Sequence, residues 1–122
     1  MKVVLVGHCS PDAFMLKSMV GRILPGTEVH VINDDDSLSG HHAEDSIWLV
    51  NRILDGAFSV GESGLDLIGA RVAAHPGARI VLISDLEEHQ HTAESLGASP
   101  GFGKKGLYED ESAERLRKLA DS

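Results

Sequence analysis

Several features that would assign a protein to a specialised class are scarce or missing in this sequence. Cys9 is the only cysteine, so the chain has no pair from which to form an internal disulfide. No apolar run approaches the roughly 18 to 20 residues that a membrane-spanning helix requires. The first residues read as a strand and lack the pattern of a cleaved secretory signal. We therefore expect a cytoplasmic protein that does not associate with membranes.

Basic residues are also in short supply. Lysine and arginine number 11 against 19 aspartates and glutamates, which gives a net charge of -8. Nucleic acids and anionic lipids are bound through basic surfaces, so this composition argues against both as partners and leaves protein partners open. The hydrophobic fraction of 42% is ordinary for a globular protein, and we expect a single domain over residues 1–122.

Apolar runs alternate with amphipathic segments along the chain. The runs predict buried strands over 3–6, 47–50 and 79–83. The alternating, β-branched residues 27–32 predict a further strand, and Gly101 to Lys105 a short edge strand. Apolar residues at helical spacing predict helices over 11–24, 65–74, 86–96 and 108–119, and residues 39–45 a short helix or an irregular crossover. This alternation indicates an α/β fold, a doubly wound parallel sheet with helices on both faces.

The strand that begins at Ser46 ends at Asn51, and the carboxyl end of a parallel strand is where such sheets place ligands and chemistry. An aspartate there could be phosphorylated, hold a metal or act as a base. An asparagine is neutral, so it is a poor nucleophile and a weak metal ligand. The function of the chain must be interpreted around this residue.

The sequence resembles the receiver domain of response regulators, the CheY-like family, over essentially its whole length. The resemblance rests on the order and spacing of Val4–Pro11, Ile47–Asn51, Glu62–Ile68, Arg79–Ser84, and Gly97-Ala98 followed by a lysine at 104 or 105. It implies a flavodoxin-like (βα)5 three-layer sandwich with a five-stranded parallel sheet of order 2-1-3-4-5. It also implies a signalling role in a two-component or phosphorelay system, without enzymatic activity.

The departures from the family pattern concern its phosphorylation pocket. The family's acidic pair falls on His8 and Cys9, and its phospho-acceptor aspartate falls on Asn51. Phosphoryl transfer to a carboxylate needs that carboxylate and a divalent cation, and Mg²⁺ prefers hard oxygen ligands. The resemblance therefore predicts a degenerate receiver, or pseudo-receiver, that is not phosphorylated by the usual chemistry and holds no metal or cofactor.

Two other family positions are retained. Ser84 and either Lys104 or Lys105 match the residues that detect the phosphoryl group in the family, and here we expect them to hydrogen-bond Asn51. Asp55, in a loop longer than the family's usual one, is an alternative acceptor that would make the chain an atypical phosphorelay receiver. The remaining acids near the predicted strand ends are Asp12, Asp34, Asp35 and Asp85.

Histidine and cysteine offer a further alternative. His8 and Cys9 could form a metal-binding or redox-sensing site, because a thiol near a lysine at a helix N-terminus becomes reactive. The simpler interpretation is that Cys9 is a small residue filling the former acidic pocket. The pairs His41-His42 and His89-His91 would bind a metal only if they converged, and we expect them at the surface.

The resemblance also locates partner contacts. In the family, the face made by the fourth helix, fifth strand and fifth helix carries dimer and partner contacts, which corresponds here to 86–96, 101–105 and 108–119. Phe102 and Tyr108 are the aromatic candidates on that face. We expect a signalling protein or histidine kinase as partner, with a homodimer through the same face as a second arrangement. A nucleotide-binding role is disfavoured, because the turn at Gly7 to Ser10 lacks a glycine-rich phosphate cradle.

Overall fold

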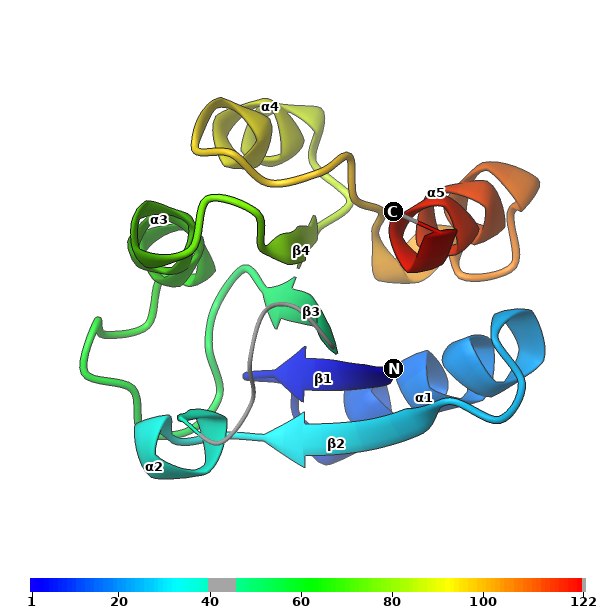
Figure 1. The fold of residues 1–122 in the computed structure, drawn as a ribbon, viewed down its shortest axis with the longest axis horizontal. Helices are drawn as coiled ribbons and strands as arrows, with labels where there is room; N and C mark the ends of the chain where they lie inside the picture. Colours follow the sequence, from blue (N-terminus) through cyan, green and yellow to red (C-terminus); the bar gives the residue numbers. More distant parts are fainter. Residues whose placement is uncertain (40–45, 122) are drawn as a thin grey trace.

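The computed structural model describes residues 1–39 and 46–121, and its centre is a parallel sheet between two layers of helix (Figure 1). The strands are β1 (Lys2–Val6), β2 (Glu28–Ile32), β3 (Ser46–Asn51) and β4 (Arg79–Ile83). They pair in the order β2-β1-β3-β4, and every pairing is parallel. This order agrees with the first four positions of the predicted 2-1-3-4-5 sheet.

The helices cover both faces of the sheet. They are α1 (Ser10–Ile23), α2 (Asp35–Leu38), α3 (Gly64–Ala74), α4 (Glu87–Ser95) and α5 (Asp110–Asp121), with a 3-10 turn, η2 (Lys104–Gly106). The core cluster on one face includes residues of α1 and α5, and the cluster on the other includes residues of α2, α3 and α4. None of the described helices is both long and apolar enough to span a membrane.

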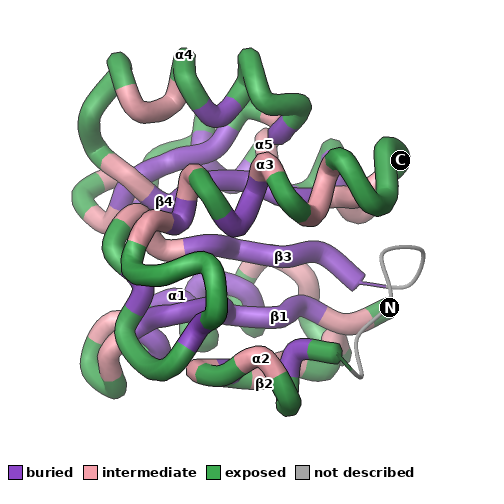
Figure 2. Tube along the Cα trace, turned by 90° about the vertical axis from the view of Figure 1, so that its left-hand side faces the viewer, coloured by how far each residue is buried: buried purple, intermediate pink, exposed green. Residues whose placement is uncertain are grey.

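Successive residues of the central strands supply the two cores in turn. In β1, Val3 and Leu5 pack with α1 and α5, whereas Val4 and Val6 pack on the opposite face. All four side chains are fully buried, and β1 and β3 run through the buried middle of the molecule (Figure 2). Burial on both faces explains why these strands are continuous apolar runs rather than alternating ones.

The predicted edge strand at Gly101 to Lys105 is not formed, so the expectation of five strands is wrong for the described chain. The segment makes a single parallel bridge, between Phe102 and Ile83, although it still lies beside β4. Pro100 has no backbone N–H to donate, and glycines at 101 and 103 are poor strand formers. The composition of the segment therefore limits the pairing to one bridge.

The side-chain amide of Gln90 lies between β4 and this segment. Its Nε2 donates to the carbonyl oxygens of Leu82 at 2.9 Å and Ser84 at 3.0 Å. Its Oε1 accepts from the backbone N–H of Gly101 at 3.2 Å. One side chain from α4 thus satisfies backbone groups that a full fifth strand would pair.

The loop from β3 to α3 is packed against the sheet rather than extended into solvent. Leu54 and Phe58 are buried in the core cluster that contains α3. The N–H of Ala57 donates to the carbonyl of Asn33 at 2.8 Å, which attaches the loop to the chain that follows β2. The loop therefore covers the carboxyl end of the sheet, next to the candidate site.

Candidate functional site

Asn51 is the last residue of β3 and lies at the carboxyl edge of the sheet. Its Nδ2 donates to the carbonyl oxygens of Gly7 at 3.0 Å and Ile53 at 2.8 Å. Its Oδ1 accepts from the N–H of Arg52 at 3.1 Å. An ionised carboxylate has no hydrogen to donate and would face the same two carbonyls unpaired. The surroundings of this position are therefore complementary to an amide.

Lys104, at the start of η2, extends its side chain into the same pocket. Its Nζ donates to Asn51 Oδ1 at 3.3 Å and to Asp12 Oδ2 at 2.7 Å. Lys105 is exposed, and its backbone N–H donates to Asp85 Oδ1 at 3.1 Å. Of the two lysines that the sequence left open, Lys104 is the one that contacts Asn51.

Asp12 supplies the carboxylate of this pocket from the first turn of α1. Hydrogen bonds from the Lys104 ammonium and then from the Cys9 side chain hold the pKa of the Asp12 carboxyl below its usual range. Sequence reasoning named Asp12 only as one of several acids near strand ends. The signal that could have singled it out is the Ser10-Pro11 helix start, which puts Asp12 in the first turn beside the pocket.

The other acids have separate roles. Asp34 caps α2 by accepting from the N–H of Ser37 at 2.7 Å, and Asp35 accepts from the N–H of Ser59 at 2.6 Å. Asp55 is exposed in the loop, and its backbone N–H donates at 2.9 Å to the Gly7 carbonyl that also binds Asn51. Asp55 therefore follows Asn51 closely in the sequence, but it contacts the pocket through its backbone N–H.

His8 and Cys9, at the positions of the family's acidic pair, carry no negative carboxylate. The His8 ring is fully buried, and its Nε2 lies 2.8 Å from the Leu49 carbonyl. Because a carbonyl only accepts, Nε2 carries the proton. Burial lowers the pKa of His8 to about 4, so the ring is neutral at pH 7. Cys9 is half-buried at the residue before α1.

Ser84 faces α4 rather than Asn51. Its hydroxyl lies 3.3 Å from His89 Nδ1 and accepts from the N–H of Leu86 at 3.3 Å. The expectation that Ser84 hydrogen-bonds Asn51 is therefore wrong, because the turn into α4 takes up the hydroxyl. Ser84 nevertheless lines, together with Asn51 and Lys104, an open hollow of about 340 Å³ at this edge of the sheet.

The histidine pairs give no metal site in the part of the chain that is described. His89 contacts Ser84, and His91 is exposed on α4. Residues 1–39 and 46–121 contain no group of three or more His, Cys, Asp or Glu side chains placed to hold a metal ion. His41 and His42 lie outside the described residues.

The two aromatic candidates for a contact face have opposite environments. Phe102 is only 5% exposed and packs in the core with α1 and α5, so its assignment to a surface is wrong. Its bridge to Ile83 directs it inward. Tyr108 is 84% exposed, and the guanidinium of Arg22 lies 4.5 Å from the centre of its ring.

Comparison with known proteins finds likeness among solved structures only. No family model and no curated protein matches the sequence. The signal receiver domain of a DNA-binding response regulator from Colwellia psychrerythraea 34H superposes with a TM-score of 0.75 at 16% identity, over 100% of this chain and 99% of that one. The chain has the fold of a response regulator receiver domain.

Two further structures support this assignment of the receiver fold. A response regulator from Thermotoga maritima has a TM-score of 0.73 at 18% identity, over 99% of this chain and 98% of that one. The receiver domain of NtrX from Brucella abortus has a TM-score of 0.64 at 23% identity, over 99% and 95% of the two chains. The likeness extends along the whole receiver fold, while the chemistry of the pocket depends on this chain's own residues.

Proposed function

We propose that this chain is a receiver-like signalling module of a two-component or phosphorelay system that is not phosphorylated by aspartyl chemistry and acts through protein contacts. The observation that carries the proposal is the placement of Asn51. Its amide stands at the end of β3 and donates to the carbonyls of Gly7 and Ile53. A neutral amide in this setting offers no carboxylate oxygen to attack a phosphoryl donor.

The rest of the pocket supports the same interpretation. Phosphoryl transfer to a carboxylate also uses a divalent cation that offsets the developing negative charge. His8 is buried and neutral, and Cys9 presents a thiol, so neither is the hard oxygen ligand that Mg²⁺ prefers. The ammonium of Lys104 is already paired with Asp12. Because its lysine and its carboxylate already pair with each other, the pocket favours one fixed state.

The test is incubation of the purified protein with acetyl phosphate and Mg²⁺, followed by intact-mass analysis. We expect no mass gain, whereas a receiver domain that keeps its acceptor aspartate, treated in parallel, gains a phosphoryl group. An acid-labile phosphoryl adduct on this chain would overturn the proposal.

An atypical acceptor is the second candidate, and Asp12 is the residue that a specific observation favours. Its carboxylate lies in the pocket, 2.7 Å from the Lys104 ammonium. If an adduct formed, its loss in Asp12→Asn and its persistence in Asp55→Asn would assign the acceptor to Asp12. The reverse result would assign it to Asp55.

A further inference from the structure

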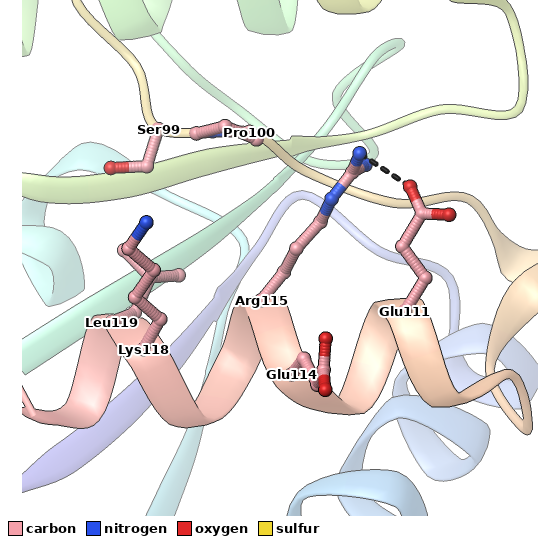
Figure 3. Close-up of a pocket in the computed structure, with 7 residues that line it drawn as sticks. All are labelled: Ser99, Pro100, Glu111, Glu114, Arg115, Lys118 and Leu119. Atoms are coloured by element: carbon pink, nitrogen blue, oxygen red, sulfur yellow. Dashed lines mark ion pairs between the residues drawn. The ribbon is translucent and has the colours of Figure 1, made fainter.

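The parallel sheet has two edges, and the described residues cover them differently. At the β4 edge, the segment after α4 lies beside the strand, and Gln90 bonds the backbone of both. Arg115 donates to the Gly101 carbonyl of this segment at 2.5 Å, from the stretch of α5 that also carries Glu111 and Glu114 (Figure 3). At the other edge, β2 pairs with β1, and no further strand of the described chain pairs with it (Figure 1).

The backbone of β2 presents hydrogen-bonding groups to this open edge. The N–H of Gly7 donates to the Ile32 carbonyl at 3.0 Å, so Ile32 directs its backbone groups toward β1. Successive residues of a strand direct these groups to opposite sides, so the N–H and C=O groups of Val29 and Val31 point away from β1. β2 contains no lysine or proline, and its register with β1 has no bulge. The usual features that protect an exposed edge from pairing are therefore missing from this strand.

The side chains of β2 add apolar surface at the same edge. Val31 is 48% exposed. Val29, two positions earlier and so on the same face, is half-buried against the core cluster of α1 and α5. Glu28 and His30 are on the opposite face, where His30 Nε2 lies 3.5 Å from Glu28 Oε2. One face of the edge is therefore apolar, and the other carries a carboxylate and an imidazole.

The part of the chain that forms this edge is less acidic than the rest. Residues 1–33, which make β1, α1 and β2, contain the cations Lys2, Lys17 and Arg22 and the acids Asp12 and Glu28, a net charge of +1. The whole chain carries -8, so residues 34–122 carry -9. A two-fold axis sets the same surface of two copies face to face. A contact of two copies through β2 therefore avoids most of the repulsion between them.

We propose that a second copy of this chain binds at the β2 edge, by antiparallel pairing of the two β2 strands about a two-fold axis at Val29. In this register the two Val29 residues exchange both backbone hydrogen bonds, and Glu28 of each copy lies opposite His30 of the other. Since an imidazole N–H donates to a carboxylate, these opposed side chains are complementary. The proposal is independent of the proposed function, because no residue of the pocket around Asn51 takes part.

Two other arrangements of copies fit the molecule less well. A two-fold contact through α4 and α5, which the family resemblance suggested, sets acidic surfaces against each other. A head-to-tail contact of β2 with the acidic α5 of another copy satisfies the charges but leaves the backbone groups of Val29 and Val31 unpaired. It would also continue into an open filament. Pairing of β2 with β2 satisfies both the charges and the backbone.

Sedimentation velocity of the purified full chain over a range of concentrations tests the proposal. Because the contact is a single short strand, we expect a reversible dimer with a Kd of about 10–100 µM. Hydrogen exchange followed by NMR on the native chain locates the contact without a variant. The amides of Val29 and Val31 should exchange more slowly as the chain is concentrated. The amide of Ile32, which faces β1, should not change.

Matched variants assign the contact to β2. Val31→Lys places a charged side chain at the edge, whereas Val60→Lys makes the same change at an exposed valine of the loop before α3. Both variants alter the net charge equally, so general repulsion between copies changes alike. We expect dimerisation to weaken at least about tenfold in Val31→Lys and less than about twofold in Val60→Lys. Tyr108→Lys, just before α5, should also leave dimerisation unchanged.

The remaining outcomes overturn the inference. A chain that stays monomeric at about 1 mM would have an edge that no second copy binds. Equal weakening in Val31→Lys and Val60→Lys would mean a non-specific effect of charge, and loss in Tyr108→Lys alone would assign the contact to another face. Species larger than a dimer would indicate the head-to-tail filament.

Two controls keep these results separable. Thermal melts check that the variants fold, and the exchange measurement on the native chain decides if Val31→Lys does not. No phosphoryl donor is present in these experiments. A chain that fails to dimerise thus leaves the proposed function intact, and a phosphoryl adduct on a chain that dimerises through β2 overturns the proposed function alone.

Discussion

The ammonium of Lys104 lies 2.7 Å from the carboxylate of Asp12, and this contact neutralises the candidate pocket from within. The same ammonium lies 3.3 Å from Asn51 Oδ1. One cation therefore joins the start of α1, the end of β3 and η2. A cation satisfied by the protein's own carboxylate has less to gain from an incoming anion. The pocket therefore serves to hold these three elements together.

Introducing an acidic residue at position 51 should weaken the fold. Asn51→Asp replaces an amide that donates to two carbonyls, those of Gly7 and Ile53, with a group that repels both. We expect the free energy of unfolding at pH 7 to fall by about 1 kcal/mol, since the half-buried residue loses two donated hydrogen bonds. Urea denaturation measures it.

The pH dependence of that variant supplies the control. Below the pKa of the new carboxyl, the protonated group regains one hydrogen to donate, so the difference from the native chain should shrink. If Asn51→Asp were as stable as the native chain at pH 7, the pocket would not be adapted to an amide.

The two adjacent lysines should differ in their contribution to stability. Lys104→Met removes the partner of Asp12, whereas Lys105→Met removes an exposed side chain. In a double-mutant cycle of Lys104→Met with Asp12→Asn we expect a coupling of about 0.5–1 kcal/mol, since the pair is partly exposed and screened by solvent. The cycle of Lys105→Met with Asp12→Asn is the matched control and should show none. Equal coupling in the two cycles would contradict the assignment of Lys104 to the pocket.

The sequence predicted the parts of the fold that depend on periodicity. The apolar runs ending at Val6, Val50 and Ile83 form β1, β3 and β4, because a strand buried on both faces must be apolar throughout. The fifth strand was predicted wrongly, because Pro100 and two glycines restrict the pairing of the short segment around Phe102. Gln90 completes that edge, and no local pattern signals a side chain that bonds backbone groups six, eight and eleven residues away.

The candidate pocket was predictable only in part. The end of a buried strand placed Asn51, because topology alone sets that position. The choice of Lys104 over Lys105, and of Asp12 over the other acids, depends on how η2 and α1 approach each other. Lys104 and Asp12 are 92 positions apart in the sequence, and the spacing of residue types along the chain does not predict such a contact.

Acidification should destabilise the protein through His8. Burial lowers the folded-state pKa of His8 to about 4 from its usual value of 6.5. Between these values the unfolded chain binds a proton that the folded chain does not, so stability falls as the pH is lowered from 6.5 to 4. The shift corresponds to about 3 kcal/mol over that window.

The comparison variant for this effect is His8→Gln, which keeps a hydrogen-bond donor but does not titrate. Its free energy of unfolding should change little between pH 6.5 and 4, whereas His91→Gln, at an exposed position, should keep the native slope. The lowered pKa of Asp12 acts in the same direction at a lower pH, because a carboxylate loses its stabilising contacts as the pH falls through its folded-state pKa. If the free energy of unfolding of His8→Gln fell with pH as steeply as that of the native chain, another group would cause the pH dependence between 6.5 and 4.

Gln90 should be essential to the sheet edge beside β4. Gln90→Ala leaves the carbonyls of Leu82 and Ser84 and the N–H of Gly101 without this partner. We expect a loss of about 2 kcal/mol in the free energy of unfolding. Hydrogen exchange should also quicken at the amide of Ser84, which bonds the Phe102 carbonyl at 3.0 Å. Glu88→Ala, exposed on the same helix, should change neither quantity. Unchanged exchange in Gln90→Ala would mean that the single bridge to Ile83 holds the segment by itself.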